Sequence, residues 1–416
     1  MGANGEVVRA RSPDADLVSS LAQTGGLPVL MVAGFACLPG SLVGQDVPGW
    51  RVAVVDTVPA SRDLPTAALV DARWDGSGRI LALGRERDVV YVLDVDGGRA
   101  EVIGGVGDGP GEFRDVSYLG RSDDGLWVID SRKRSLAVFD ENRELLRERR
   151  LEVGYSSGSL PLEPVWRWAD GGVVATERIA GGNVARVSEQ GTRVVELGET
   201  VGSGRVLTTL AVEHAFLVAA AGGRVFQGLQ PWSDADRVAF GPAGHTIAVL
   251  RRPSDLVDGS ATYEISFWKA ERRTPRSVRV RFRPRPLDAE EVEGYLQDLA
   301  SGLGEGADDL AEAIRDSLFV PEGVPIARGG RILGGPGQFF VGWSGEAWLR
   351  AEEDESDDAE DTDSVWHIVD EDGFVARATV PEGIRLSAVR GEHALGLIRN
   401  AFDVTNIVRL RIERAP

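Results

Sequence analysis

The chain has little that could support cysteine or histidine chemistry. Cys37 is the only cysteine among 416 residues, which excludes an internal disulfide and a cysteine-rich metal site. The four histidines, at positions 214, 245, 367 and 393, are too far apart in the sequence for a local zinc motif. The glycine-rich stretch from residue 104 to 111 lacks the Gly-Lys-Ser/Thr ending of a phosphate-binding loop, so we expect it to be a connector between strands.

Positive charge is also scarce. The sequence has 46 basic and 65 acidic residues, a net charge of −19, and only two lysines, Lys133 and Lys269. Such an acidic surface repels nucleic-acid phosphates and anionic membranes, so we expect no nucleic-acid partner. A hydrophobic content of 43% excludes a disordered chain, and 52 glycines indicate many turns.

The N-terminal segment, residues 1–46, resembles an export signal. Residues 17–45 carry no charge, Arg9 and Arg11 precede them, and small residues follow the most apolar part. We therefore expect an extracytoplasmic protein, periplasmic or secreted, that meets a membrane only through this segment; a flexible tail is the alternative. Cys37 raises the further alternative of a lipid anchor, but residues 34–36 before it differ from the usual lipoprotein context.

One structural unit recurs six times between residues 50 and 414. An apolar strand ends at an arginine, a polar loop follows, and a second apolar strand comes after it. The arginines are Arg85, Arg132, Arg178, Arg251, Arg350 and Arg399. The strands that follow them are expected at residues 89–93, 136–139, 184–187, 263–268, 365–369 and 404–410.

The spacing of these arginines predicts the fold. Three successive intervals are 47, 46 and 49 residues, and two longer ones, of 73 and 99 residues, indicate insertions. A period in the forties is typical of a four-stranded propeller blade. The sequence therefore predicts an all-β, six-bladed β-propeller, with seven blades as the alternative. We expect Trp127, Trp268, Trp348 and Trp366 to pack between blades.

The ends of the propeller chain are expected to pair. Residues 51–55 form an apolar run that belongs to no other blade, and the last unit supplies only about three strands. Adding residues 51–55 as the outer strand of the last blade would close the ring and remove exposed sheet edges.

Two insertions interrupt the repeat. Residues 287–320 predict a helical hairpin, in which Asp288, with Glu291 three residues further on, gives the N-cap of the first helix. Leu310, Ile314 and Leu318 mark the second helix. The other insertion lies at residues 202–236.

Part of the repeat resembles a known family. Gly105–Phe113, Asp124–Asp130 and Leu136–Asp140 are similar to an NHL-type repeat, and the whole chain resembles bacterial exported six-bladed β-propeller proteins of the NHL/TolB-like group. This resemblance implies the fold and export. It implies almost nothing about activity.

The loops after the second strands and the connections between blades should share one face of a propeller. The six arginines would then form an anion-binding ring at the mouth of the central channel; the simpler alternative is that they pair with nearby acids. Asn400, Asp403 and Asn406 could hold a divalent cation such as Ca²⁺, although a hairpin turn also explains them. The predicted function is a monomeric binding or scaffold protein for a small anionic ligand or a protein partner. The alternative is a metal-dependent hydrolase or lyase of the lactonase-like or amidating-lyase-like propeller type.

Overall fold

The structure is a computed structural model in which strands dominate. It describes residues 47–58, 69–84, 86, 88–95, 100–153, 162–177, 191–198, 204–211, 215–219, 225–229, 235–251, 256–301, 312, 315, 338–351, 363–402 and 404–414. Of the predicted arginines, Arg85 and Arg178 lie outside these residues, as do Asp403 and the whole predicted export segment.

Four antiparallel four-stranded sheets follow one another along the chain. Sheet 1 contains β2 (Leu69–Trp74), β3 (Ile80–Gly84), β4 (Val90–Leu93) and β5 (Ala100–Ile103). Sheet 2 contains β6 (Val116–Ser122), β7 (Gly125–Asp130), β8 (Ser135–Phe139) and β9 (Leu145–Arg150). Sheet 3 contains β10 (Leu162–Arg167), β11 (Val173–Glu177), β12 (Thr192–Glu196) and β13 (Arg205–Leu210). Sheet 4 contains β16 (Arg237–Phe240), β17 (Thr246–Arg251), β18 (Ala261–Lys269) and β19 (Arg276–Phe282).

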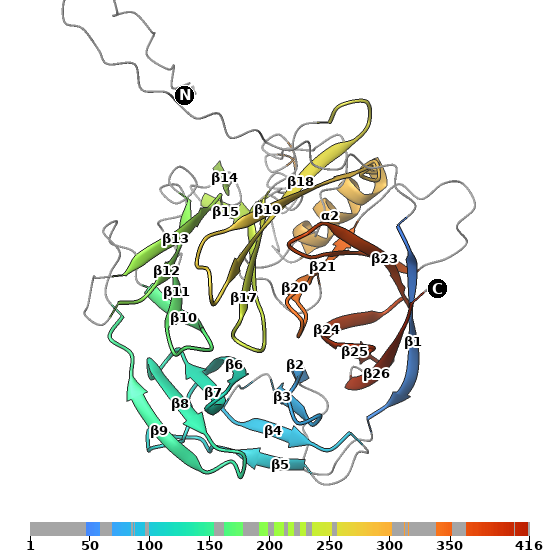
Figure 1. Cartoon of the computed structure of the whole chain (residues 1–416). Coiled ribbons are helices and arrows are strands. Elements are labelled where there is room, and N and C mark those ends of the chain that lie inside the picture. Colours follow the sequence, from blue (N-terminus) through green and yellow to red (C-terminus); the bar gives the residue numbers. More distant parts are fainter. Residues whose placement is uncertain are drawn as a thin grey trace, which may run out of the picture. The chain divides into compact units, whose positions relative to one another are not determined.

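The remaining strands of the ring form one eight-stranded sheet, in the order β20-β21-β22-β23-β1-β26-β25-β24. Its strands are β20 (Phe339–Val341), β21 (Ala347–Ala351), β22 (Ser364–Val369), β23 (Phe374–Val380), β24 (Ile384–Arg390), β25 (His393–Arg399), β26 (Thr405–Arg414) and β1 (Gly49–Thr57). Figure 1 shows the sheets arranged around a central axis like the blades of a propeller, with β2, β6, β20 and β24 close to that axis.

The two ends of the ring pair as the sequence predicted. β1 runs antiparallel to β26, with Val52 opposite Ile412, and forms the outer strand beside it. The pairing predicted for residues 51–55 is therefore confirmed. The sequence did not predict that β1 also pairs in parallel with β23, through Gly49, Trp50 and Arg51. This second pairing joins what would otherwise be two separate sheets.

The recurring unit of the sequence corresponds to the second and third strands of the sheets. Five of the six predicted following strands overlap β4, β8, β18, β22 and β26. The prediction for sheet 3 was wrong in position, because β11 pairs with β12 at residues 192–196. The predicted residues 184–187 lie outside the described part of the chain.

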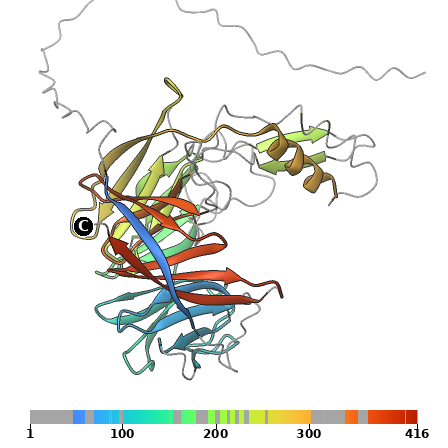
Figure 2. The same ribbon diagram turned by 90° about the vertical axis from the view of Figure 1, so that its right-hand side faces the viewer.

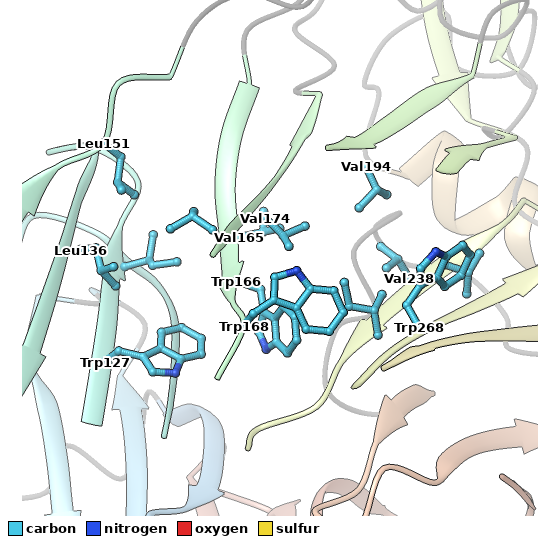
Figure 3. Packing of buried hydrophobic residues seen from close by; sticks show 14 of the residues in the cluster. Trp127, Leu136, Leu151, Val165, Trp166, Trp168, Val174, Val194, Val238 and Trp268 are labelled. Carbon is cyan, nitrogen blue, oxygen red and sulfur yellow. The ribbon is translucent and has the colours of Figure 1, made fainter. Parts of the chain in front are cut away.

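Large apolar side chains fill the space between neighbouring sheets. Trp127, Trp268, Trp348 and Trp366 are 0%, 4%, 1% and 1% exposed, which confirms their predicted burial. Figure 3 shows one such core, where Trp127 of sheet 2 lies near Trp166 and Trp168, and Trp268 of sheet 4 completes the cluster. Buried aromatic area of this kind contributes much of the free energy that holds such sheets together.

The insertions lie on one side of the ring. α2 (Ala289–Ser301) follows β19, and the hairpin of β14 (Ala215–Ala219) and β15 (Val225–Leu229) follows β13. Both project from the same side in Figure 2. The predicted N-cap is present: Asp288 Oδ1 accepts a hydrogen bond from the Glu290 amide at 2.9 Å, and Glu291 Oε2 lies 3.5 Å from the Asp288 amide.

Most of the second predicted helix falls outside the described residues, although Arg315 donates to Glu293 of α2 at 2.8 Å. Among the described helical residues, no helix has the length and apolar character needed to span a bilayer.

The opposite side of the ring carries the short turns between first and second strands. Backbone bonds link these turns: Arg121 N donates to Pro242 O at 3.0 Å, and Ala169 N donates to Gly244 O at 2.9 Å. Trp343 N donates to Val389 O at 2.9 Å. These bonds tie different parts of the ring directly to one another.

An ion pair reinforces this side of the ring. Arg167, at the end of β10, donates to both carboxylate oxygens of Asp124, at 2.8 and 2.9 Å. This hydrogen bonding from Arg167 lowers the pKa of Asp124 from 3.8 to about 2. The pair connects sheet 3 to the turn between β6 and β7 of sheet 2.

We expect Val52→Asn to lower the free energy of unfolding by more than about 2 kcal/mol, because it buries an amide in the closing strand. Val52 is 1% exposed, whereas Val55 on the same strand is 58% exposed. The matched variant Val55→Asn should stay within about 0.5 kcal/mol of the wild type. Denaturant unfolding measures both, and equal effects would contradict the assigned register of β1.

We expect Asp124→Asn to lower the free energy of unfolding by about 1–2 kcal/mol at pH 7, a value discounted because the Asp124 side chain is 36% exposed. A carboxyl with a lowered folded-state pKa stabilises above its unfolded pKa of 3.8 and loses this effect as pH falls towards 2. The difference from the wild type should therefore shrink below pH 4 and be about halved at pH 3. The exposed neighbour Asp123→Asn is the control, and a difference that does not change with pH would contradict this role.

Candidate functional site

The topology defines one face of the ring on which loops gather. In each four-stranded sheet the chain runs up and down, so the loop between second and third strands and the connection to the next sheet emerge at the same end. We call this end the loop-bearing face. The four described arginines of the predicted ring lie there, at or near the same end of β7, β17, β21 and β25: Arg132, Arg251, Arg350 and Arg399.

Arg251 has a structural contact on this face. It donates to Asp236 Oδ2 at 2.6 Å and to the Thr209 carbonyl at 2.7 Å, and it also contacts the hydroxyl of Thr208. These bonds connect sheet 4 to β13 of sheet 3, as the simpler alternative for the arginines proposes. Arg132 and Arg399 are exposed, and Arg350 is half-buried. An anion-binding ring of all six arginines stays a prediction.

The predicted cation ligands lie at the turn between β25 and β26. The Asn400 side-chain oxygen accepts hydrogen bonds from the amides of Phe402 and Val404, at 2.9 and 3.1 Å. Asn406 lies in β26, opposite Ile398. Asn400 thus shapes the turn, and the calcium site that includes Asp403 stays a prediction. Within the described residues, no three His, Cys, Asp or Glu side chains gather closely enough to hold a metal ion.

The connector from β5 to β6, residues 104–113, folds back on itself on the loop-bearing face. Gly107 N donates to Phe113 O at 3.1 Å, and Gly109 N donates to Glu112 Oε2 at 2.8 Å. Gly104 has a positive φ of 81°, and a Cβ there would lie 2.3 Å from the Phe113 ring. The glycine amides bond within the protein, which agrees with a connector rather than a phosphate-binding loop.

Lys133 fixes this connector to sheet 2. Its ammonium donates to the carbonyls of Gly109 and Glu112, at 3.0 and 2.8 Å, and lies 2.8 Å from Glu148 Oε1. The other Glu148 oxygen accepts from Gly111 N at 2.9 Å. Burial alone would raise the pKa of Glu148, but the bonds from Lys133 and Gly111 outweigh it and lower the pKa.

A cavity of about 500 Å³ opens beside this clamp. Seven residues line it, and we call it the connector pocket: Asp108, Pro110, Lys133, Ser135, Leu145, Glu148 and Arg150. Its volume lies within the range of small-molecule sites. The sequence showed Lys133 and the glycines, but it gave no sign that the connector and β9 enclose a cavity, because those segments are more than thirty residues apart in the chain.

Charged residues on the innermost strands were missed by sequence reasoning. Asp71 and Arg73 lie on β2, and Arg385 lies on β24. Arg73 Nε donates to Asp71 Oδ2 at 2.8 Å, and Arg385 donates to the Val70 carbonyl at 2.9 Å. The available signal was an Asp-x-Arg pair inside the apolar run Leu69–Trp74.

Another motif that sequence reasoning missed is Gly-Tyr-Ser-Ser-Gly at residues 154–158. It has the Gly-x-Ser-x-Gly spacing of a nucleophile elbow. The motif lies outside the described residues. An elbow turns from a strand into a helix, whereas this segment connects β9 to β10.

Comparison with known proteins gives no assignment. No family model matches the chain, and no curated protein matches it. A candidate exported protein of Bacteroides fragilis is 12% identical, covers 89% of this chain and 98% of its own, and has a TM-score of 0.43. The PQQ-bound aldose sugar dehydrogenase of Streptomyces coelicolor is 12% identical over 88% of this chain and 98% of its own, with a TM-score of 0.39.

The β-propeller domain of Cps50 from Myceliophteria thermophila is 10% identical over 86% of this chain and 99% of its own, with a TM-score of 0.36. With TM-scores below 0.5, these similarities carry no argument about the activity of this chain.

We expect Lys133→Met to lower the free energy of unfolding by about 3 kcal/mol, because it leaves the Glu148 carboxylate largely buried without its cation. The pKa of Glu148 should rise, since burial then acts with less opposition. Hydrogen exchange should become faster at the amides of Gly107 and Gly111. The exposed neighbour Arg134→Met is the control, and unchanged exchange in Lys133→Met would contradict the clamp.

Proposed function

We propose that this protein is an extracytoplasmic, non-enzymatic binding propeller that holds a small anionic molecule in the connector pocket. The observation that carries the proposal is the cavity itself, about 500 Å³ in volume, which lies on the loop-bearing face. A rigid ring that presents variable loops on one face is a common arrangement for binding.

The charge around the connector pocket favours an anion. Lys133 is paired with Glu148, and Asp108 is paired with Arg114 at 2.7 Å. The opposite charges within each of these two pairs cancel. Arg132 and Arg150, in contrast, form no ion pair within the described residues. The Arg114 hydrogen bond lowers the pKa of Asp108, and Lys133 and Arg132 contribute to this effect through their charges. Arg132 and Arg150 are therefore the exposed cations that we expect to attract an anion in a protein of net charge −19.

The proposal includes six blades and membership of the NHL/TolB-like group. The eight-stranded sheet consists of two antiparallel halves, β20–β23 and β24–β26 with β1, which are joined only by three parallel residue pairs. Counting each half as a blade gives six. The similarity to an NHL repeat lies in the connector and in β7 and β8, which are the elements that the Lys133 clamp joins.

Export remains part of the proposal because of the sequence of residues 1–46. The charge-free stretch with arginines before it has the composition of a signal peptide.

Titration calorimetry with inorganic phosphate and with sulfate tests whether the connector pocket binds anions. We expect both anions to bind, more weakly at high salt, and the double variant Arg132→Ala/Arg150→Ala to lose at least about tenfold in affinity. Both side chains are exposed, so the variant should fold normally.

The matched control is Arg276→Ala/Arg279→Ala, which removes two exposed arginines from β19 of sheet 4. This control should bind as the wild type does. Equal losses in both double variants, or no binding by the wild type at tens of millimolar, would overturn the proposal.

A further inference from the structure

Four of the innermost strands carry a β-bulge. In β2, β6, β10 and β24 the pairing with the second strand shifts by one residue, at Val70, Ser117, Val165 and Ser387. A bulge re-aims the side chains that follow it and frees backbone groups from the ladder. The residues directly after the bulges are therefore candidates for side chains with an unusual direction.

Three of the residues that directly follow the bulges are apolar or aromatic. They are Tyr118, Trp166 and Ala388. Tyr118 meets the edge of Phe240 at 6.3 Å between ring centroids, and Trp166 stacks on the same ring at 5.6 Å. The fourth residue is Asp71, which is the only carboxylate of the four.

Asp71 is buried, and one of its oxygens has no partner. The residue is 6% exposed, and Oδ1 makes no hydrogen bond to the described residues. A buried acceptor left unpaired costs about 1–3 kcal/mol. A ligand that brings a hydrogen-bond donor to Oδ1 would recover this cost, so the site is suited to a donor group.

Two arginines near Asp71 are suited to a carboxylate. Arg73 donates through Nε to Asp71 and through Nη1 to the Leu119 carbonyl, and its Nη2 has no partner among the described residues. Arg385 donates to the carbonyl that the bulge at Val70 frees. Desolvation by the surrounding protein lowers the pKa of Arg385, and the charge of Asp71 opposes this effect. Part of the Arg385 side chain still reaches solvent.

The two arginines and one aspartate carry a net positive charge. The guanidinium groups repel a metal cation and attract an anion. An anion that has no hydrogen-bond donor would leave Asp71 Oδ1 unpaired. The negative charge of Asp71 would also repel such an anion. The site therefore discriminates between anions by whether they also donate a hydrogen bond.

We infer that Asp71, Arg73 and Arg385 form a second ligand site, on the innermost strands, for a small carboxylate that carries a hydroxyl or ammonium donor beside its carboxyl group. The carboxylate contacts the arginines, and the donor bonds to Asp71 Oδ1. This site is separate from the connector pocket and does not depend on it.

Three ligands of equal carbon number test the inference: L-lactate, L-alanine and propionate. Ligand-observed NMR titration should show that the wild type binds lactate or alanine at least about tenfold more tightly than propionate, which lacks the donor. The stronger of the first two identifies the donor as hydroxyl or ammonium.

Two variants separate the roles of the residues. Asp71→Asn keeps the shape but removes the charge, and it should reduce the preference over propionate to less than about threefold. Arg385→Gln, at an exposed position, should weaken all three ligands by a similar factor. Arg279→Gln, on the outer strand β19, is the control and should leave all three unchanged.

Propionate binding as tight as lactate and alanine, an unchanged preference in Asp71→Asn, or no binding of any of the three would overturn the inference. A crystal structure of the lactate soak that shows only water at Asp71 Oδ1 would also overturn it. The double variant Arg132→Ala/Arg150→Ala should leave lactate binding intact, so failure of the connector pocket and failure of this site are distinguishable.

Discussion

The pairing of β1 with β26 is the interaction on which the rest of the structure depends. A ring of sheets held by side-chain packing still has two chain ends, and an unpaired strand at either end would expose a row of amides and carbonyls. β1 covers the edge of β26 and at the same time pairs with β23, so two neighbouring sheets share one strand. Burial of Val52 beside Ile412 adds apolar packing to this hydrogen bonding.

The two faces of the ring differ in how tightly they are built. On one face, short turns bond directly to turns of other sheets, and Arg167 adds an ion pair to Asp124. On the other face lie the connector, the α2 insertion and the exposed arginines. The loop-bearing face also carries contacts between sheets, since Arg251 ties sheet 4 to sheet 3 there, whereas Arg132 has no such contact within the described residues.

The sequence predicted the second and third strands well because they are buried on both sides. Every residue of β7 and β8 is buried, and residues 126–129 and 136–139 within them appear as uninterrupted apolar runs. The first strands are harder to recognise, because bulges break their alternation and polar residues interrupt them, as in Leu69–Trp74. For the same reason Asp71 and Arg385 escaped notice, while arginines at the ends of apolar strands were easy to find. The connector pocket depends on a contact between Gly111 and Glu148, which no local pattern encodes.

The shared strand has a consequence for how the chain is made. Val52 and Ile412 are about 360 residues apart, so the ring cannot close until nearly the entire polypeptide has left the ribosome. At roughly 5–20 residues per second, that interval is on the order of 20–70 s. During it, both edges of β1 await their partners β23 and β26 and need protection from association with other chains. A chain of this fold that crosses a membrane N-terminus first would be translocated before β1 can pair with β26. Its ring of sheets would close only on the far side of the membrane.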